Sequence, residues 1–268
     1  MVRCQRLGRS VSMAGVDDLS TSAHAADISR WKSQSGLEMP IRFRFGLHPL
    51  AEVGLWGGDR PTLHWFGLTD GWYRIELGDV HLLKFAADYD IPYVDYHVVR
   101  LWEDLLALLP AALEEVPPDL IDFLESDSRD WCEVESEAVD AAIDCWSDRS
   151  LNFSYLREPP SLRCWRTGDD ITIDWNAPAN FAEPRTLRTT VTVADFVSAV
   201  DELHTTLMAA MEARIIEVEA SPRPGVDLDL ANLHREHQER AQWLTHASSR
   251  IRTTDWTAVR SGATQLQP

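Results

Sequence analysis

LHWFGLTDGWYRIELGDVHLLKF, residues 63–85, is the stretch on which the predicted fold depends. Two aromatic pairs stand in it, at positions 65 and 66 and at positions 72 and 73, and each of these side chains can bury on the order of 150–250 Å². Gly67, Asp70 and Gly71 lie between the two aromatic pairs and favour a chain reversal. Gly78 and Asp79 suit a second, tighter turn. The stretch therefore predicts a β-hairpin that forms the nucleus of the fold.

Alternating and β-branched segments predict further strands on both sides of this hairpin. The clearest alternation is Ile-Arg-Phe-Arg-Phe at 41–45, which places three apolar side chains on one face. A second hairpin is predicted around Gly168. The expected strands are residues 41–45, 62–66, 72–77, 80–85, 151–155, 162–166, 171–175 and 186–193.

Apolar residues at helical spacing predict long helices between and after the strands. Asp95 is expected to cap the first long helix, and Thr192 with Asp195 matches a capping box for the longest one. The combination predicts an α+β fold, in which antiparallel β-hairpins pack against several long amphipathic helices. The expected helices are residues 96–109, 119–125, 129–146, 194–219, 229–249 and 255–259.

Composition along the chain indicates how it is divided into domains. Residues 1–38 are rich in serine, alanine, glycine and aspartate and lack apolar periodicity, so they are expected to be a disordered extension. Residues 39–265 are expected to form a single α+β domain, with two lobes, 39–148 and 150–265, as the alternative. No window reaches the roughly 20 apolar residues that a membrane span needs.

The chain carries a net charge of −18 at pH 7, and this charge is unevenly distributed. Residues 114–148 hold 13 acidic side chains and one arginine. A field of this sign disfavours nucleic acids and anionic membranes as partners and favours a basic protein. Four cysteines, at positions 4, 132, 145 and 164, stand far apart in the sequence, which predicts free thiols in a reducing, cytoplasmic compartment.

Carboxylates and an imidazole near the aromatic turn are the candidate catalytic residues, namely Asp70, Asp95 and His97. An aspartate beside tryptophans can have its pKa raised by desolvation, and Asp95 with His97 could form an acid–base pair. The aspartates also have structural explanations, because Asp-Gly favours a turn and aspartate favours a helix N-terminus. The ligand-facing residues of such a pocket would be Trp65, Trp72, Tyr93 and Arg100.

The acidic segment is the candidate binding surface for a partner. Its predicted helix, 129–146, would expose carboxylates on the side away from the core, where they could dock a basic protein and raise its association rate. The alternative is an ordinary solvated helix face. The candidate residues are Glu133, Glu135, Glu137, Asp140 and Asp144.

Other kinds of site find little support in the sequence. It contains no G-x-S-x-G nucleophile motif and no glycine-rich phosphate loop. His234 and His237 lie three residues apart on one predicted helix, but no third ligand is indicated, and His237 is expected to be partly buried and hydrogen-bonded. No metal and no cofactor are therefore predicted, and the oligomeric state stays open.

Three groups of residues identify a family resemblance. They are His-Trp-Phe-Gly-Leu-Thr-Asp-Gly-Trp-Tyr at 64–73, Tyr-Val-Asp-Tyr at 93–96 with Val-Arg-Leu-Trp-Glu-Asp at 99–104, and Asp-Trp with Ala-Val-Arg within 255–260. With them the chain resembles an uncharacterised bacterial family known only as a domain of unknown function, from about Met39 to Gly262. The resemblance implies no activity and no site residues. In its acidity and its hairpin motif the chain is also similar in style to bacterial toxin-immunity modules.

Three alternative functions follow from these observations. The first is a non-enzymatic protein-interaction role, of the immunity or regulatory type, through the acidic segment. The second is a hydrolase-like enzyme and the third a small-ligand-binding module, both using an aromatic-lined pocket with Asp70, Asp95 and His97. Convergence of those three side chains on one point would favour the enzyme. If these three side chains instead point apart, and residues 114–148 form a continuous acidic surface, the interaction role is favoured.

Overall fold

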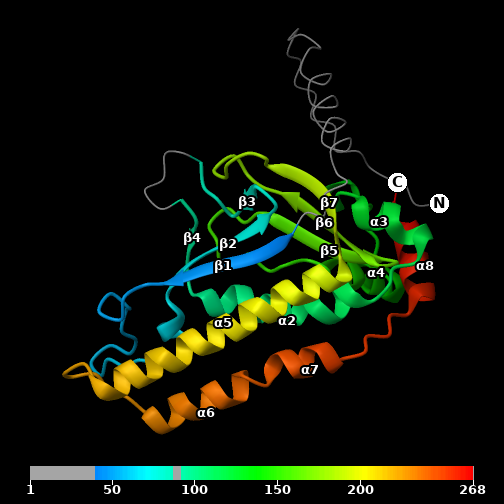
Figure 1. Cartoon of the computed structure of the whole chain (residues 1–268). Coiled ribbons are helices and arrows are strands. Elements are labelled where there is room, and N and C mark those ends of the chain that lie inside the picture. Colours follow the sequence, from blue (N-terminus) through cyan, green and yellow to red (C-terminus); the bar gives the residue numbers. More distant parts are fainter. Residues whose placement is uncertain (1–39, 87–91, 268) are drawn as a thin grey trace.

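Two antiparallel β-sheets with helices packed along them make up the fold (Figure 1). The computed structural model describes residues 40–86 and 92–267. The predicted α+β class is confirmed by this arrangement. The predicted disordered extension, residues 1–38, lies outside the described residues.

The aromatic hairpin and its neighbours build the first sheet, in which the strand order is β1-β2-β3 and β4 also pairs with β2. β1 and β2 pair along their whole length, so that Phe43 lies opposite Ile75 and both side chains are buried. Gly78, with a φ of 56°, closes the predicted tight turn. The strands are β1 (Ile41–Leu47), β2 (Gly71–Leu77), β3 (Val80–Leu82) and β4 (Val94–Asp95).

The second sheet is a three-stranded meander in the order β5-β6-β7. Its predicted hairpin is confirmed, since β5 pairs with β6 and Gly168 takes a φ of 59° in the turn between them. An isolated bridge between Phe85 and Phe181 joins the two halves of the chain, and the two rings stack 5.0 Å apart. The strands are β5 (Ser161–Thr167), β6 (Asp170–Asn176) and β7 (Thr186–Thr192).

Two long helices, α2 (Val98–Leu113) and α5 (Val193–Ala220), cover the sheets and contact each other and strands of both sheets (Figure 1). The main hydrophobic core lies between these layers and draws on both predicted lobes, with Trp102 from one and Ile173 from the other. Among the described residues, no helix combines the length and the apolar character that a bilayer-spanning segment needs.

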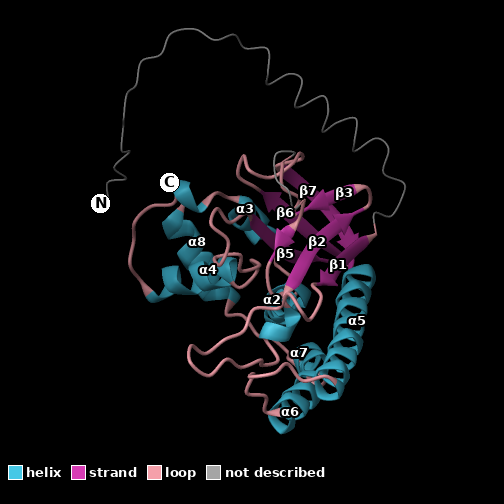
Figure 2. Cartoon of the chain, turned by 90° about the vertical axis from the view of Figure 1, so that its left-hand side faces the viewer, coloured by secondary structure: helices cyan, strands magenta, loops and turns pink. Residues whose placement is uncertain are grey.

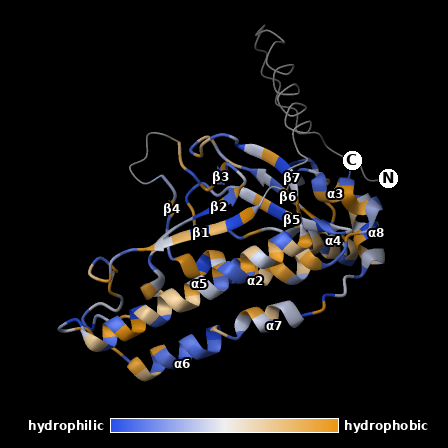
Figure 3. Ribbon diagram, viewed as in Figure 1, coloured by the Kyte–Doolittle hydropathy of each residue, from blue (hydrophilic) through white to orange (hydrophobic). Residues whose placement is uncertain are grey.

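The start of α5 confirms the Thr192 half of the predicted capping box, while Asp195 bonds to the Thr192 hydroxyl in place of its main-chain N–H. The Thr192 hydroxyl accepts the Asp195 N–H at 3.0 Å and donates to the Asp195 carboxylate at 2.7 Å. The helix predicted after it, 229–249, is instead two helices, because the chain turns at Ala241 and Gln242. The first of the two is largely hydrophilic (Figure 3). They are α6 (Leu230–Arg240) and α7 (Trp243–Ser249).

A second core cluster lies where α3, α4 and α8 gather at one end of the molecule (Figure 2). Trp165 of β5 belongs to this cluster and ties it to the second sheet. The predicted helix 255–259 continues to Leu266 in the structure. The helices are α3 (Ile121–Glu125), α4 (Glu137–Ser147) and α8 (Trp256–Leu266), and short 3-10 turns lie at Gly67–Thr69, Pro118–Leu120 and Ser128–Asp130.

The expected strand at 62–66 is wrong. Thr62 makes isolated bridges, and the chain then enters the 3-10 turn that precedes β2. His64 Nδ1 accepts the Gly67 N–H at 3.2 Å, and the Thr69 hydroxyl donates to the Phe66 carbonyl at 2.7 Å. Side-chain hydrogen bonds of this local kind compete with strand pairing and stabilise a turn.

The predicted cap of the first long helix is also wrong. Asp95 lies in β4, and α2 begins at Val98 with His97 at its N-cap position and no side-chain cap. At its other end α2 passes through Pro110. Proline removes one helical hydrogen bond, but the buried Ala111 beyond it keeps the last turn packed on the core.

Two further predicted elements differ from the structure. The helix expected at 129–146 begins only at Glu137, because the Ser136 side chain accepts the Val139 N–H at 3.2 Å and caps it there. The segment 151–155 is irregular and not a strand, although Phe153 is buried as its apolar character predicted. Burial of a side chain does not by itself specify the backbone conformation.

Candidate functional site

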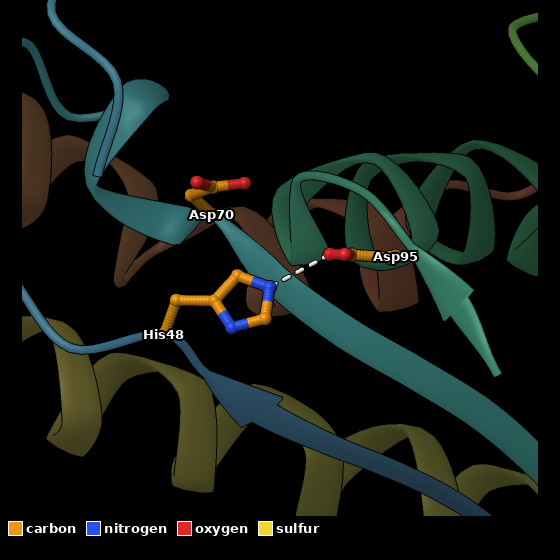
Figure 4. Close-up of side chains that lie close together, drawn as sticks. All are labelled: His48, Asp70 and Asp95. Atoms are coloured by element: carbon orange, nitrogen blue, oxygen red, sulfur yellow. Dashed lines mark hydrogen bonds and ion pairs between the residues drawn. The ribbon is translucent and has the colours of Figure 1, made fainter. Parts of the chain in front are cut away.

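Three strand ends meet at one corner of the first sheet. β1 ends opposite Gly71, the first residue of β2, so His48 and Asp70 are the next residues on either side. The His48 N–H donates to the Asp70 carbonyl at 3.0 Å. β4 brings Asp95 opposite Trp72, one residue further along β2. Strand pairing therefore places the side chains of His48, Asp70 and Asp95 beside one another (Figure 4).

These three side chains form what we call the His–Asp–Asp cluster. Each offers one potential ligand atom, and the three atoms lie within 4.8 Å of one another. The His48 Nε2 and Asp95 Oδ1 atoms are 2.7 Å apart, and the two side chains are 28% and 32% exposed. An imidazole hydrogen-bonded to one carboxylate and close to a second one can hold a cation or transfer a proton.

A buried arginine holds the two chain segments that carry His48 and Asp70. Arg214 of α5 is 8% exposed, and its guanidinium donates to the Leu68 carbonyl at 2.6 Å and to the His48 carbonyl. Burial lowers the pKa of Arg214, and the negative charges of Glu217 and Asp70 oppose this effect. A guanidinium at this depth needs hydrogen-bond acceptors, so it fixes both carbonyls in place.

Two glycines allow the backbone to pair closely behind the cluster. A β-carbon at Gly71 would lie 2.2 Å from the Gly46 carbonyl oxygen, and a β-carbon at Gly46 would lie 2.6 Å from Nε1 of Trp72. A side chain at Gly71 would meet backbone and push the strands apart, whereas one at Gly46 would displace the Trp72 indole. The His–Asp–Asp cluster is thus carried by a closely paired backbone.

His97 lies next to the cluster but is not one of its three members. Its ring packs on Phe66, with ring centres 4.5 Å apart, and lies 6.1 Å from the ring of Trp56. Burial lowers the pKa of His97, and the charge of Asp70 partly offsets this. The predicted trio therefore does not meet at one point, because the histidine beside the two aspartates is His48.

Trp65 lies in the core. It is fully buried and donates its Nε1–H to His237 Nδ1 at 3.4 Å. The partly buried, hydrogen-bonded state predicted for His237 is confirmed, and burial lowers its pKa. Trp65 faces Trp102 of α2, with ring centres 6.3 Å apart, so it packs the hairpin against that helix and does not face a surface ligand.

The other predicted ligand-facing residues lie on the surface of the first sheet or near it. Trp72 and Tyr93 stack with ring centres 5.4 Å apart, and the Arg74 guanidinium lies 4.5 Å from the Tyr93 ring centre. Arg100 is exposed, and its guanidinium lies 5.1 Å from the ring centre of Phe66. The aromatic rings in these contacts are partly exposed and stack on one another or on arginine side chains.

The five acidic candidates are all exposed, and we call them the acidic face. Two precede α4 and three lie on its exposed side. Within the described ranges none of the five forms an ion pair, whereas acids on neighbouring elements do, such as Asp148 with Arg252 and Asp119 with Arg260. The acidic face comprises Glu133, Glu135, Glu137, Asp140 and Asp144.

Two hollows of the described surface lie away from these residues. One, of about 230 Å³, is lined by residues that include Phe85, Arg157 and Phe181. The other, of about 270 Å³, is lined by residues that include Asp119 and Arg260. Neither hollow contains a candidate catalytic residue.

Comparison with known families matches residues 42–262 to a family of unknown function, DUF5984. The chain belongs to DUF5984. The match covers both sheets, α2 to α7 and most of α8, and it includes the His–Asp–Asp cluster and the acidic face. No curated protein and no solved structure matches this DUF5984 chain.

His48 is the member of the cluster that the sequence analysis did not single out. It follows the predicted strand 41–45, in a segment with many proline and glycine residues. The sequence did contain an indication of its position. The strand at 41–45 needs an antiparallel partner, and pairing with the strand after Asp70 brings His48 to the same corner of the sheet. The register of that pairing is set by contacts between distant segments.

Proposed function

We propose that this DUF5984 protein is a non-enzymatic interaction module, of the immunity or regulatory type, that binds a basic protein through the acidic face. The observation that supports this function is the set of five exposed carboxylates that form no ion pair with any residue the structure describes, on a chain of net charge −18. Such a surface attracts a cationic partner and speeds its association.

The placement of Asp144 argues that these acids do more than stabilise their helix. Carboxylates stabilise a helix near its N-terminus, where Glu137 lies, and destabilise it near its C-terminus. Asp144 is in the last turns of α4, and the next acid, Asp148, is neutralised by Arg252 at 2.6 Å. An exposed, unpaired carboxylate at this end of the helix is unfavourable for the isolated chain and favourable beside a cation.

An apolar side chain lies among these charges. Ile143 of α4 is 38% exposed, between Asp140 and Asp144 in the sequence. Protein interfaces commonly combine a small apolar centre with a polar rim. The partner that fits this surface carries lysine or arginine side chains around an apolar contact.

The test begins with capture of a partner from native cells by the full chain at low and at high salt. The identified partner is then purified, and its Kd is measured against two triple variants with the same net charge. We expect the acidic-face variant to weaken binding by about tenfold or more, mainly by slowing association, and to reduce the salt dependence. This variant is Glu137→Gln with Asp140→Asn and Asp144→Asn.

The matched control removes three exposed carboxylates elsewhere, and it should leave the Kd within about twofold. Equal effects of the two variants would show that net charge and not the acidic face matters, and would contradict the proposal. A partner without a basic surface, or no retained partner at low salt, would also contradict it. The control is Asp59→Asn with Asp201→Asn and Glu212→Gln.

The second candidate function is a hydrolase-like or small-ligand-binding role at the His–Asp–Asp cluster. It is favoured by the convergence of Asp70 and Asp95 with His48 as the neighbouring imidazole, although the enzyme hypothesis required His97 at that place. The open surroundings of the cluster support it less, because small-ligand sites are usually concave. It fails if no ester, amide or phosphoester substrate turns over.

A further inference from the structure

We propose that His48, Asp70 and Asp95 bind a single divalent transition-metal cation of the Zn²⁺ type. The three potential ligand atoms lie within 4.8 Å of one another, as they must to share one ion. One imidazole nitrogen and two carboxylate oxygens form a mixed set that suits Zn²⁺ or Mn²⁺, whereas Ca²⁺ and Mg²⁺ prefer oxygen alone. This inference is independent of the acidic face.

The negative charges of the cluster favour binding of a cation. Two carboxylates this close repel each other unless a positive charge lies between or beside them. Arg214 is a buried cation close to the cluster, but its hydrogen bonds within the described part of the chain go to the main-chain carbonyls of Leu68 and His48, not to a carboxylate. A bound metal ion would compensate Asp70 and Asp95 directly.

The site is also held in position before any ion arrives. His48 and Asp70 are joined through the main chain at 3.0 Å, Arg214 donates a hydrogen bond to the carbonyl of His48, and the absence of a side chain at Gly71 lets the two strands pair closely. Metal sites depend on such outer contacts for the orientation of their ligands. Binding would replace the His48–Asp95 hydrogen bond by bonds from the ion to His48, Asp70 and Asp95, and the proton of that hydrogen bond would be released to solvent.

The exposure of the ligands indicates which kind of metal site this would be. With side chains 28% and 32% exposed at His48 and Asp95, water can reach the ion from the solvent side. Three protein ligands with an open position are typical of catalytic zinc sites, and four closed ligands of structural ones. The ion would thus be exchangeable, and the fold would not depend on it.

The test is isothermal titration of the metal-free, full-length protein with Zn²⁺ alone. We expect one ion per chain, with affinity that falls as the pH is lowered, because protons compete for the imidazole and the carboxylates. Asp70→Asn and Asp95→Asn each preserve side-chain shape and should weaken Zn²⁺ binding by roughly tenfold or more. Circular dichroism of each variant without metal should match the wild type.

The matched control is His234→Gln, because His234 and Glu219 form a surface histidine–carboxylate pair at 3.5 Å that is not part of a three-ligand group among the described residues. This variant should bind Zn²⁺ as the wild type does. The absence of stoichiometric binding, or equal affinity in the wild type and both aspartate variants, would overturn the proposal. So would a loss of binding in His234→Gln.

Discussion

Asp104 shows how burial alters the chemistry of a single side chain in this fold. Its Oδ2 atom is buried and makes no hydrogen bond among the described residues. Burial raises the pKa of Asp104 to about 7, although the charge of Arg100 opposes the shift. Close by, the Tyr73 and Tyr155 hydroxyls share a hydrogen bond of 2.7 Å, and burial, aided by the charge of Asp104, raises the pKa of both.

The raised pKa predicts a pH-dependent stability that Asp104→Asn should remove. The folded state holds this proton up to about pH 7, whereas the unfolded chain releases it near 3.8. The wild type therefore loses stability as the pH rises through that window, and the neutral variant does not. We expect Asp104→Asn to be more stable than the wild type by about 1–2 kcal/mol at pH 8, allowing for partial solvent screening, and by far less at pH 4.

Urea unfolding at several pH values between 4 and 8 measures this difference. Asp201→Asn, which changes an exposed aspartate on α5, is the control and should show no comparable pH-dependent gain. If the stability difference between Asp104→Asn and the wild type stayed constant across the range, the carboxyl group would not be titrating as burial predicts.

At the scale of secondary-structure elements, α4 and α8 pack so closely that only glycine fits at position 262, where the two helices meet. A β-carbon at Gly262 would lie 1.9 Å from the Ala138 carbonyl oxygen and 2.8 Å from the Ala142 side chain. The obstacle is backbone, which cannot rotate away as a side chain can. The contact holds the second core cluster together, because α4 and α8 both contribute to it.

Gly262→Ala therefore has two opposing effects on stability. Alanine favours an isolated helix by about 1 kcal/mol, while overpacking of a close contact typically costs about 1–3 kcal/mol. We expect a net loss, because the backbone overlap forces α8 away from α4. Thermal unfolding compared with Ser261→Ala, an exposed neighbour on α8, measures it. A stabilised Gly262→Ala would mean that the helices are free to separate.

Across the whole molecule, one carboxylate connects three distant parts of the chain. Glu114 follows α2, pairs with the buried Arg149 at 2.9 Å, and accepts the Thr254 N–H and hydroxyl at 2.8 and 2.6 Å. Arg252 lies 3.5 Å from the same carboxylate. These contacts join the end of α2, the second residue after α4 and the segment that leads to α8.

Glu114→Gln should destabilise the protein by about 3 kcal/mol, since it leaves the Arg149 charge buried without its counter-ion. The matched control is Glu115→Gln, which removes the neighbouring, exposed carboxylate and should change stability by less than about 0.5 kcal/mol. Urea unfolding measures both. Equal losses for the two variants would contradict the role of the buried pair.

How much of the fold the sequence predicted depends on how far apart in the chain the interacting residues lie. The strand at 72–77, the second hairpin and the Thr192 helix cap depend on neighbours in sequence, and the structure confirms them. The expected strand at 62–66 failed because side chains bond locally into a turn. The single helix at 229–249 failed because the chain turns at Ala241 and Gln242, a break that the apolar pattern did not mark.

The sequence by itself determined the α+β class, the family and the exposure of the acidic face, because alternation, helical periodicity and motifs are properties of adjacent residues. Only the tertiary structure decided that Trp65 packs in the core and does not line a ligand pocket, and that His48, and not His97, lies beside Asp70 and Asp95. The physical reason is strand register: the pairing of β1 and β4 with β2 results from many contacts between distant segments.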